Sequence, residues 1–120
     1  MDSGNNQTKF HDRLKKLMDE YVHFVYDITL TFPKDEMFGV TSQIRRASLS
    51  IILNYIEGYA RKKKLVLKNF LEISYGSLKE SKYLLYFSYK RKYLSEENYK
   101  IGLLKAEEIG RMVWGILLRM

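Results

Sequence analysis

One stretch of the sequence, residues 41–58 (TSQIRRASLSIILNYIEG), carries more apolar surface than one face of a surface helix can bury. On a helix that turns about 100° per residue, its side chains fall into three stripes. The first stripe holds Ile44, Ser48, Ile51 and Tyr55, the second Leu49, Ile52 and Ile56, and the third, which is polar, Gln43, Arg46, Ser50, Asn54 and Glu57. A helix on the outside of a small monomer needs one apolar stripe. We therefore expect this helix to be buried on two sides, with its second stripe in an interface between subunits.

Apolar residues recur at spacings of three and four along the rest of the chain, which predicts three further helices. With the first stretch included, the four helices are expected at residues 9–31, 41–58, 64–90 and 96–119. Pro33 ends the first helix, because the residue before a proline disfavours helical geometry. Thr41 is expected to cap the start of the second helix and Gly58 to stop it. Ser95, followed by two glutamates, has the pattern of a cap for the last helix.

Four helices joined by short connections predict one all-α domain over residues 9–120, an up-down-up-down antiparallel four-helix bundle. Residues 1–8 are polar and are expected to form a disordered tail. In this topology the 58–64 loop lies at the same end as both chain termini. The chain has no cysteine, a polar N-terminus and no apolar run of about 18 residues. We therefore expect no disulfide, signal peptide or membrane span, and a cytoplasmic protein.

The net charge of +7 is concentrated in one segment. Residues 1–60 have a net charge of −1 and residues 93–120 a net charge of 0, whereas residues 61–92 carry ten basic side chains against two acidic ones. A localised basic field favours an anionic partner. The alternative is a solvated face that keeps the protein soluble, although solubility does not require the charges to be segregated.

Basic residues at the two flanks of this segment are the candidates for contacts with nucleic acid: Arg61, Lys62, Lys63, Lys64, Lys68, Lys90, Arg91 and Lys92. Such side chains neutralise phosphates, and phosphate contacts carry no sequence information. Between the flanks, Lys79 and Lys82 alternate with tyrosines, which can stack on exposed bases. Tyrosines at helical spacing are also typical of amphipathic packing, so both interpretations stay open for them.

A metal site or an enzyme active site is only weakly indicated. Glu20 and His23 match one Glu-x-x-His pair, but a di-iron bundle needs two such pairs and two more glutamates. Glu57, Glu72 and Glu80 are carboxylates that a metal-dependent nuclease could use, yet their spacing fixes no two-metal site. We therefore expect no catalytic residue, no metal and no other cofactor.

The segments FPKDEMFGVTSQIRRASLSI and NYIEGYARKK resemble the "four helix bundle protein" family. This family includes the 23S ribosomal-RNA intervening-sequence proteins, and it includes or borders on the accessory variability determinants (Avd) of diversity-generating retroelements. The resemblance runs from about Phe32 to the C-terminus. Its marks are Pro33, Gly39, residues 41–46, Asn54, Glu57, Gly58, Gly76, Ser77, Glu80 and residues 107–112. The intervening-sequence branch usually has Pro-Ser where this chain has Ile52 and Leu53, a departure that leans toward the Avd-like branch.

The resemblance implies a barrel-like homopentamer with a basic surface and a role without enzymatic activity. In the Avd-like branch that role is to partner a retroelement reverse transcriptase and its template RNA. Our leading hypothesis is thus an accessory protein that binds RNA or DNA. The alternative is a structural or protein-interaction bundle of the intervening-sequence type with an acidic protein partner. Five residues with the family marks are expected to act in structure or assembly, the glutamates paired to arginines within or between subunits: Arg45, Arg46, Asn54, Glu57 and Glu80.

Overall fold

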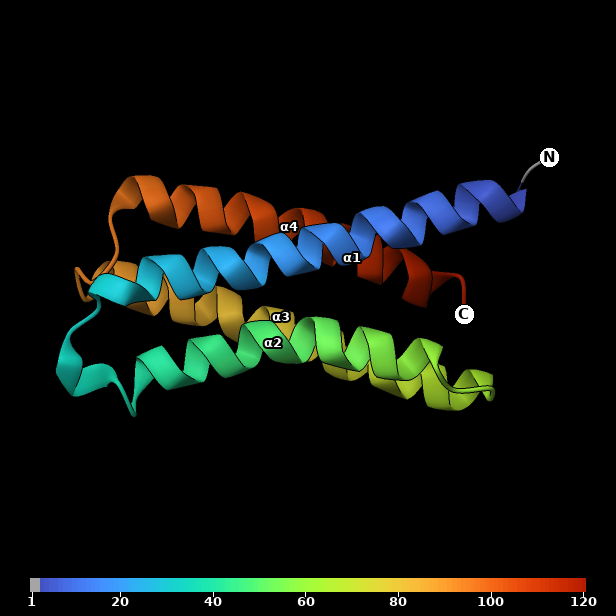
Figure 1. The fold of residues 1–120 in the computed structure, drawn as a ribbon, viewed down its shortest axis with the longest axis horizontal. Coiled ribbons are helices and arrows are strands. Elements are labelled where there is room, and N and C mark those ends of the chain that lie inside the picture. The colour runs from blue at the N-terminus through green and yellow to red at the C-terminus, as the bar shows by residue number, and fades with distance from the viewer. Residues whose placement is uncertain (1–2) are drawn as a thin grey trace.

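The computed structural model describes residues 3–120 and contains four long helices. These are α1 (Ser3–Ile28), α2 (Val40–Tyr59), α3 (Lys64–Lys90) and α4 (Glu96–Leu118). They run up and down in turn and form an elongated bundle of 50 × 25 × 20 Å (Figure 1). Both termini and the α2–α3 loop lie at one end, and the other two connections lie at the opposite end. The part of the chain that the structure describes has no strand, which confirms the all-α four-helix expectation.

The order of the helices around the bundle decides which surfaces lie opposite one another. Helix α1 packs on α2 and α4, and α3 packs on the same two helices, with the α2–α3 contact the most extensive. The outer surface between α1 and α2 therefore faces away from the outer surface between α3 and α4. A partner on one of these surfaces leaves the other open.

The core is apolar with a few hydrogen-bonded hydroxyls. Its largest fully buried side chains include Tyr21, Tyr55, Leu14, Ile44, Leu71, Leu78 and Ile109. The Tyr21 hydroxyl lies 2.9 Å from the Ser81 hydroxyl, which donates to the Leu78 carbonyl at 2.8 Å. Burial raises the pKa of Tyr21 to about 12, since the charged phenolate is poorly solvated there.

Small residues let α2 and α3 approach closely. The Ser74 hydroxyl donates to the Ile51 carbonyl at 2.7 Å, and the hydroxyls of Ser50 and Ser77 lie 2.7 Å apart. A Cβ atom on Gly58 would lie 2.9 Å from the Phe70 Cβ. Gly58 is therefore an interior packing position of α2, and the expectation that it stops the helix is wrong.

The helix starts show where local patterns decide and where packing does. Ser95 caps α4 as expected, accepting from the Asn98 amide at 3.1 Å. Thr41 does not cap α2, because the helix begins one residue earlier and the Glu36 carboxylate accepts from the Val40 amide at 3.2 Å. Glu36 reaches that position from a short 3₁₀ turn, Lys34–Glu36, which follows the proline.

Helix α1 begins earlier than the periodicity predicts. It starts at Ser3, so the expected disordered tail is corrected for residues 3–8, while residues 1 and 2 lie outside the described part. Asn6 and Gln7 line a depression together with Arg119 and Met120 of the C-terminal end. The end of α4 thus offers the first turns of α1 a surface that the local sequence does not reveal. At its other end α1 passes into a 3₁₀ turn, Thr29–Thr31, ahead of Pro33.

Candidate nucleic-acid interface

The eight predicted contact residues form two separate groups. Arg61, Lys62, Lys63, Lys64 and Lys68 lie at and just after the α2–α3 loop, and we call them the loop cluster. Lys90, Arg91 and Lys92 lie where α3 ends, and we call them the end cluster. The two groups are separated by the length of a 27-residue helix, about 40 Å. They therefore do not form one compact site in a single chain.

The loop cluster is an exposed turn with unneutralised charge. Arg61 pairs with Glu57 at 2.6 Å, and its guanidinium lies 5.3 Å from the Phe70 ring centre. Lys62, Lys63 and Lys64 are exposed and form no ion pair within residues 3–120. These three exposed ammonium groups, which have no ion-pair partner among the described residues, are the part of the loop cluster best suited to phosphate.

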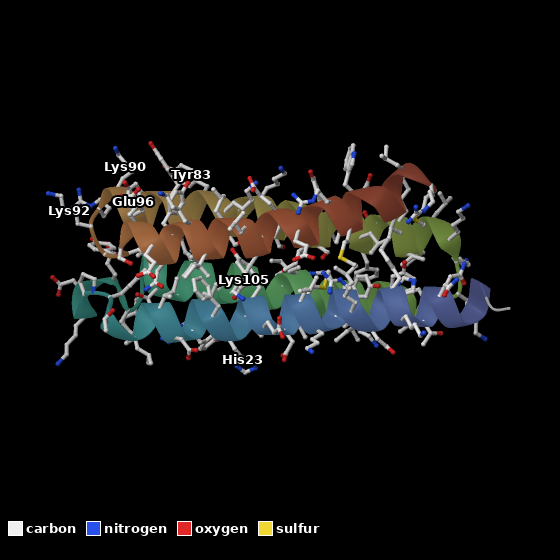
Figure 2. All side chains as sticks on the ribbon, turned by 90° about the horizontal axis from the view of Figure 1, so that it is seen from above. His23, Tyr83, Lys90, Lys92, Glu96 and Lys105 are labelled. Atoms are coloured by element: carbon white, nitrogen blue, oxygen red, sulfur yellow. The ribbon has the colours of Figure 1, made fainter. Side chains whose placement is uncertain are left out.

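The end cluster is held by a left-handed turn. Lys92 has a φ of 66°, the one positive φ among the described non-glycine residues, and its amide donates to the Tyr89 carbonyl at 2.9 Å. Lys90 and Lys92 project outward at this end of the bundle (Figure 2). Arg91 is exposed but lies close enough to Glu36 to affect that carboxylate.

Glu36 ties the end cluster to the start of α2. Its pKa is lowered first by the hydrogen bond from the Val40 amide, then by the Tyr93 hydroxyl, which donates at 2.9 Å, and then by the charge of Arg91. A carboxylate that accepts hydrogen bonds is stabilised in its charged form. Glu36 thus accepts hydrogen bonds that hold the start of α2, and it neutralises only part of the positive charge of the end cluster.

The lysines between the two clusters are engaged with aromatic and acidic neighbours. The Lys79 ammonium lies 5.2 Å from the Tyr75 ring centre, and Lys82 pairs with Glu107 at 3.8 Å. The tyrosines of α3 also contact aromatic residues of α4, a pairing that the spacing along α3 alone does not predict. Trp114 packs against Tyr75 with ring centres 5.4 Å apart, and Tyr99 stacks on Tyr89 at 4.9 Å.

The sequence of the chain matches a known family over most of its length. The profile of the family described as "23S rRNA-intervening sequence protein" matches residues 13–115. The chain belongs to this family. The family resemblance expected from the sequence is therefore confirmed, and the replacement of Pro-Ser by Ile52 and Leu53 does not remove the chain from it.

A solved structure supports the fold of this family member. The chain is similar to the crystal structure of a protein of unknown function from the S23 ribosomal protein family of Bacteroides thetaiotaomicron. The two share 21% identity, over 87% of this chain and 97% of that chain, with a TM-score of 0.78. A comparison with curated proteins finds no match.

Within the described part of one chain, the five residues with the family marks are not paired with one another, and pairing between subunits stays a prediction. Glu57 pairs with Arg61 of the loop cluster instead of with Arg45 or Arg46. The Arg45 Nε donates to the Thr29 hydroxyl at 2.8 Å, and its guanidinium lies 4.7 Å from the Tyr26 ring centre. Within a chain, Arg45 therefore joins α2 to α1. Its neighbour Arg46 is exposed and makes no such contact with the described residues.

Of the remaining two marked residues, Asn54 lies at the α2–α3 contact and Glu80 lies on the exposed surface of α3. Asn54 donates to the Ser50 carbonyl at 2.8 Å and to the Ser50 hydroxyl at 2.9 Å, beside the pair of hydroxyls that joins the two helices. Glu80 is exposed and forms no ion pair within the described part of the chain. Asn54 thus acts inside one chain of this family member, and Glu80 is free for a contact outside it.

The second apolar stripe is only partly free for an interface. Leu49 and Ile52 are half-buried, and Ile52 packs against the core of its own chain. Ile56 is 50% exposed, and its neighbour Leu53 is 58% exposed. The outer face of α2 therefore presents Leu53 and Ile56 most openly, whereas Leu49 and Ile52 are more covered.

Neither histidine lies in a metal cluster. His23 projects away from the bundle (Figure 2) and pairs with Asp19 at 3.5 Å. His11 packs at the loop-cluster end, where its Nδ1 contacts the Tyr55 hydroxyl and burial lowers its pKa. No group of three histidines, cysteines or carboxylates within residues 3–120 is arranged to hold a metal ion. None of the helices in that range combines the length and hydropathy that crossing a bilayer requires.

Proposed function

We propose that this chain is a non-enzymatic accessory protein that binds RNA or DNA with little sequence preference, through the loop cluster and the end cluster. The observation that carries the proposal is the confinement of the excess charge to residues 61–92, together with three loop lysines that form no ion pair within the described residues. Exposed, unpaired ammonium groups gain most from phosphate, because counterions are released when they bind it.

The finer form of the proposal follows the resemblance to Avd-like proteins. The chain would assemble through the apolar stripe of α2 into a homopentamer and partner a reverse transcriptase and its template RNA. Assembly would repeat the basic clusters around the oligomer. Weak contacts from several chains would then add on one strand by raising the effective concentration of the next contact.

The test is a salt titration of binding to a fluorescently labelled RNA, followed by anisotropy. Affinity should fall steeply with salt, with a log–log slope of roughly −0.7 per contacted phosphate on a single strand. The variant K62Q/K63Q/K64Q should flatten the slope by about 2 and weaken binding of unrelated sequences alike. Arg61 stays in place, because it pairs with Glu57.

A matched control separates local contact from overall charge. Lys9, Lys16 and Lys34 are exposed and lie outside the basic segment, so K9Q/K16Q/K34Q removes the same charge elsewhere. The control should keep the wild-type slope. If both triple variants lose affinity equally, or neither does, the loop cluster is a solvated face and the proposal fails.

The alternative function is a structural bundle with an acidic protein partner. This alternative rests on the same excess of basic residues in 61–92, but its partner carries carboxylates instead of phosphates. A poly-glutamate chain measured at the same salt concentrations distinguishes the two. Binding of poly-glutamate with an affinity equal to that of RNA favours the protein partner, whereas a clear preference for RNA favours the nucleic acid.

A further inference from the structure

A groove runs along the outer surface between α3 and α4, and Tyr75 lies at its middle. On one side of Tyr75 is a depression of about 320 Å³ that is lined by Lys79, Lys82 and Arg111. On the other side is a depression of about 370 Å³ lined by Lys68 and Trp114. The two depressions share Tyr75 and form one path that approaches the loop cluster.

A glycine keeps the groove open between its two walls. Gly110 lines the first depression, and a Cβ atom at this position would lie 3.1 Å from the Leu78 Cδ2. Because Gly110 has no side chain, α4 can approach α3 there and the depression between the two helices stays open. The long side chains of Lys82 and Arg111 then stand on either side of the shallow floor.

The charge of the groove is positive and only partly neutralised. Lys68, Lys79, Lys82 and Arg111 line it together with two acids, Glu72 and Glu107. Glu107 pairs with Lys82, whereas Arg111 is exposed and forms no ion pair within residues 3–120. A groove with more cations than anions favours an anionic occupant.

The aromatic side chains of the groove restrict that occupant further. Trp114 is 48% exposed, and its ring packs against the Tyr75 ring at an interplanar angle of 35°. Farther along the same surface, Tyr99 stacks on Tyr89 at an angle of 6° and contacts Tyr86 at 6.3 Å. These rings lead from the depressions toward the end cluster, so aromatic groups and cations line the surface between the two basic clusters.

We infer that this groove is a track for single-stranded nucleic acid, in which bases stack on Trp114 and phosphates contact Lys79, Lys82 and Arg111. The inference rests on the proposed function and adds the strandedness of the ligand and the path that it takes. Exposed aromatic rings bind unpaired bases, whose faces are free, whereas a duplex keeps its base faces stacked inside. From Lys68 to Lys90 the path measures about 33 Å, at 1.5 Å per helical residue.

The position of the groove is compatible with self-assembly. Ile56 of the apolar stripe lines a depression together with His11 and Lys15 of α1, on the side of the bundle away from the outer surface between α3 and α4. A contact made through the stripe therefore covers no part of the groove on the chain that contributes the stripe.

Trp114 provides a direct test, because it is the one tryptophan of the chain. The protein is titrated with a labelled oligouridine of about 12 nucleotides and, separately, with a blunt RNA duplex of the same length. The fluorescence anisotropy of the labelled oligonucleotide reports binding, and the intrinsic tryptophan fluorescence of the protein reports stacking. We expect the oligouridine to quench the tryptophan in step with its anisotropy, and the duplex to leave the tryptophan fluorescence unchanged.

Substitutions test the two halves of the inference separately. Trp114→Ala should weaken oligouridine binding about five-fold or more, and Trp114→Phe, which keeps a ring, should weaken it less. The pair K79Q/R111Q should reduce the salt slope by about 1.4, whereas the control pair K16Q/K34Q on other surfaces should not change it. Circular dichroism and thermal unfolding establish whether each variant is folded. If Trp114→Ala does not fold, the salt slope of K79Q/R111Q is the test of the groove.

The possible failures point to different conclusions. If the anisotropy shows salt-dependent binding while the tryptophan is not quenched and both groove variants bind like the wild type, the groove inference is wrong and the proposed function stands. Equal quenching by the duplex overturns the assignment to single strands. If the anisotropy shows no binding at low salt, the proposed function fails and the groove inference fails with it.

Discussion

At the scale of single residues, two adjacent arginines in one family-marked run have different surroundings. Arg45 is half-buried, bonds to the Thr29 hydroxyl and lies over the Tyr26 ring, so it fixes α2 against α1. Arg46 is exposed on the polar stripe and has no such contact within residues 3–120. Residue type and sequence position are nearly the same for both, and only the packing of α1 distinguishes them.

Arg45→Ala should therefore lower the free energy of unfolding by about 1–2 kcal/mol. The loss comes from one hydrogen bond of a charged donor and one cation–π contact at a partly exposed site. Arg46→Ala should change the free energy of a single chain by less than about 0.5 kcal/mol. Urea unfolding of both variants measures the difference. If Arg46→Ala is as destabilising as Arg45→Ala, or changes the oligomer mass, then Arg46 makes a contact between subunits.

Tyr21 gives a prediction for the dependence of stability on pH. Its folded-state pKa of about 12 lies above the ordinary value of 10.0, so the neutral phenol favours folding. This contribution is fully present below pH 10 and is lost as the pH rises toward 12 and beyond. The variant Tyr21→Phe has no hydroxyl at this position, so its stability lacks this dependence on pH. The stability difference between wild type and Tyr21→Phe should shrink as the pH is raised from 9 to 12 in urea titrations, and a constant difference would contradict the assignment to Tyr21.

At the scale of helices, the contact between α2 and α3 depends on one glycine, whereas another glycine on α3 is free of close neighbours. A Cβ at Gly58 would lie 2.9 Å from the Phe70 Cβ and 3.1 Å from the Leu67 Cδ1. A Cβ at Gly76 would have no atom outside its own helix backbone within 4 Å. Both glycines carry the family marks, but within one chain only Gly58 is required for packing.

Gly58→Ala and Gly76→Ala should consequently have opposite effects on stability. Alanine in a helix interior is favoured over glycine by up to about 1 kcal/mol. At Gly76 this gain should appear as higher stability. At Gly58 the crowded contact with α3 should outweigh it and leave a net loss of about 1–3 kcal/mol. Thermal unfolding of the two variants provides the comparison. A stabilising Gly58→Ala would mean that α2 and α3 can move apart at little cost.

The elements that the sequence predicted well are those decided by local periodicity. The expected bounds of 64–90 coincide with α3, those of α2 differ by one residue at each end, and Ser95 caps α4. The misses depend on residues outside the helix concerned. The first turns of α1 line a depression together with the end of α4, and the cap of α2 comes from Glu36 on the preceding turn. No pattern within either helix records such a partner.

The candidate site was predictable in its charge but not in its shape. The confinement of basic residues to 61–92 is a property of the sequence, and it located both clusters. The groove needs a second wall from α4, whose surroundings in the sequence are neutral. Arg111 and Trp114 gain their significance only because α4 returns antiparallel beside α3 and brings them next to Tyr75. A search along one helix at a time cannot find that pairing.

At the scale of the whole molecule, the surfaces of the bundle divide into a basic side and an apolar side. The groove between α3 and α4 runs from Lys68 of the loop cluster to Lys82, and the outer face of α2 presents Leu53 and Ile56. These two surfaces share no residue, so the proposed assembly through the α2 stripe and the proposed nucleic-acid contacts of the groove use different side chains of one chain. The arrangement predicts that a variant which blocks assembly keeps a folded chain and the intrinsic contacts of its groove, while it loses avidity.

Assembly can be tested by light scattering, where the wild type should have a mass several times 14.3 kDa. Ile56→Glu should reduce that mass to the mass of one chain, because assembly would bury an unpaired carboxylate. Ile56 is a better choice than Ile52, which packs against the core of its own chain, so that a charge there would also disturb folding. Leu104→Glu, at a site on α4 that is 68% exposed, is the matched control and should leave the mass unchanged. A wild-type mass of one chain at micromolar concentration would show that the apolar stripe of α2 does not join subunits. In that case each strand would meet only one pair of basic clusters, and RNA affinity should not change in Ile56→Glu.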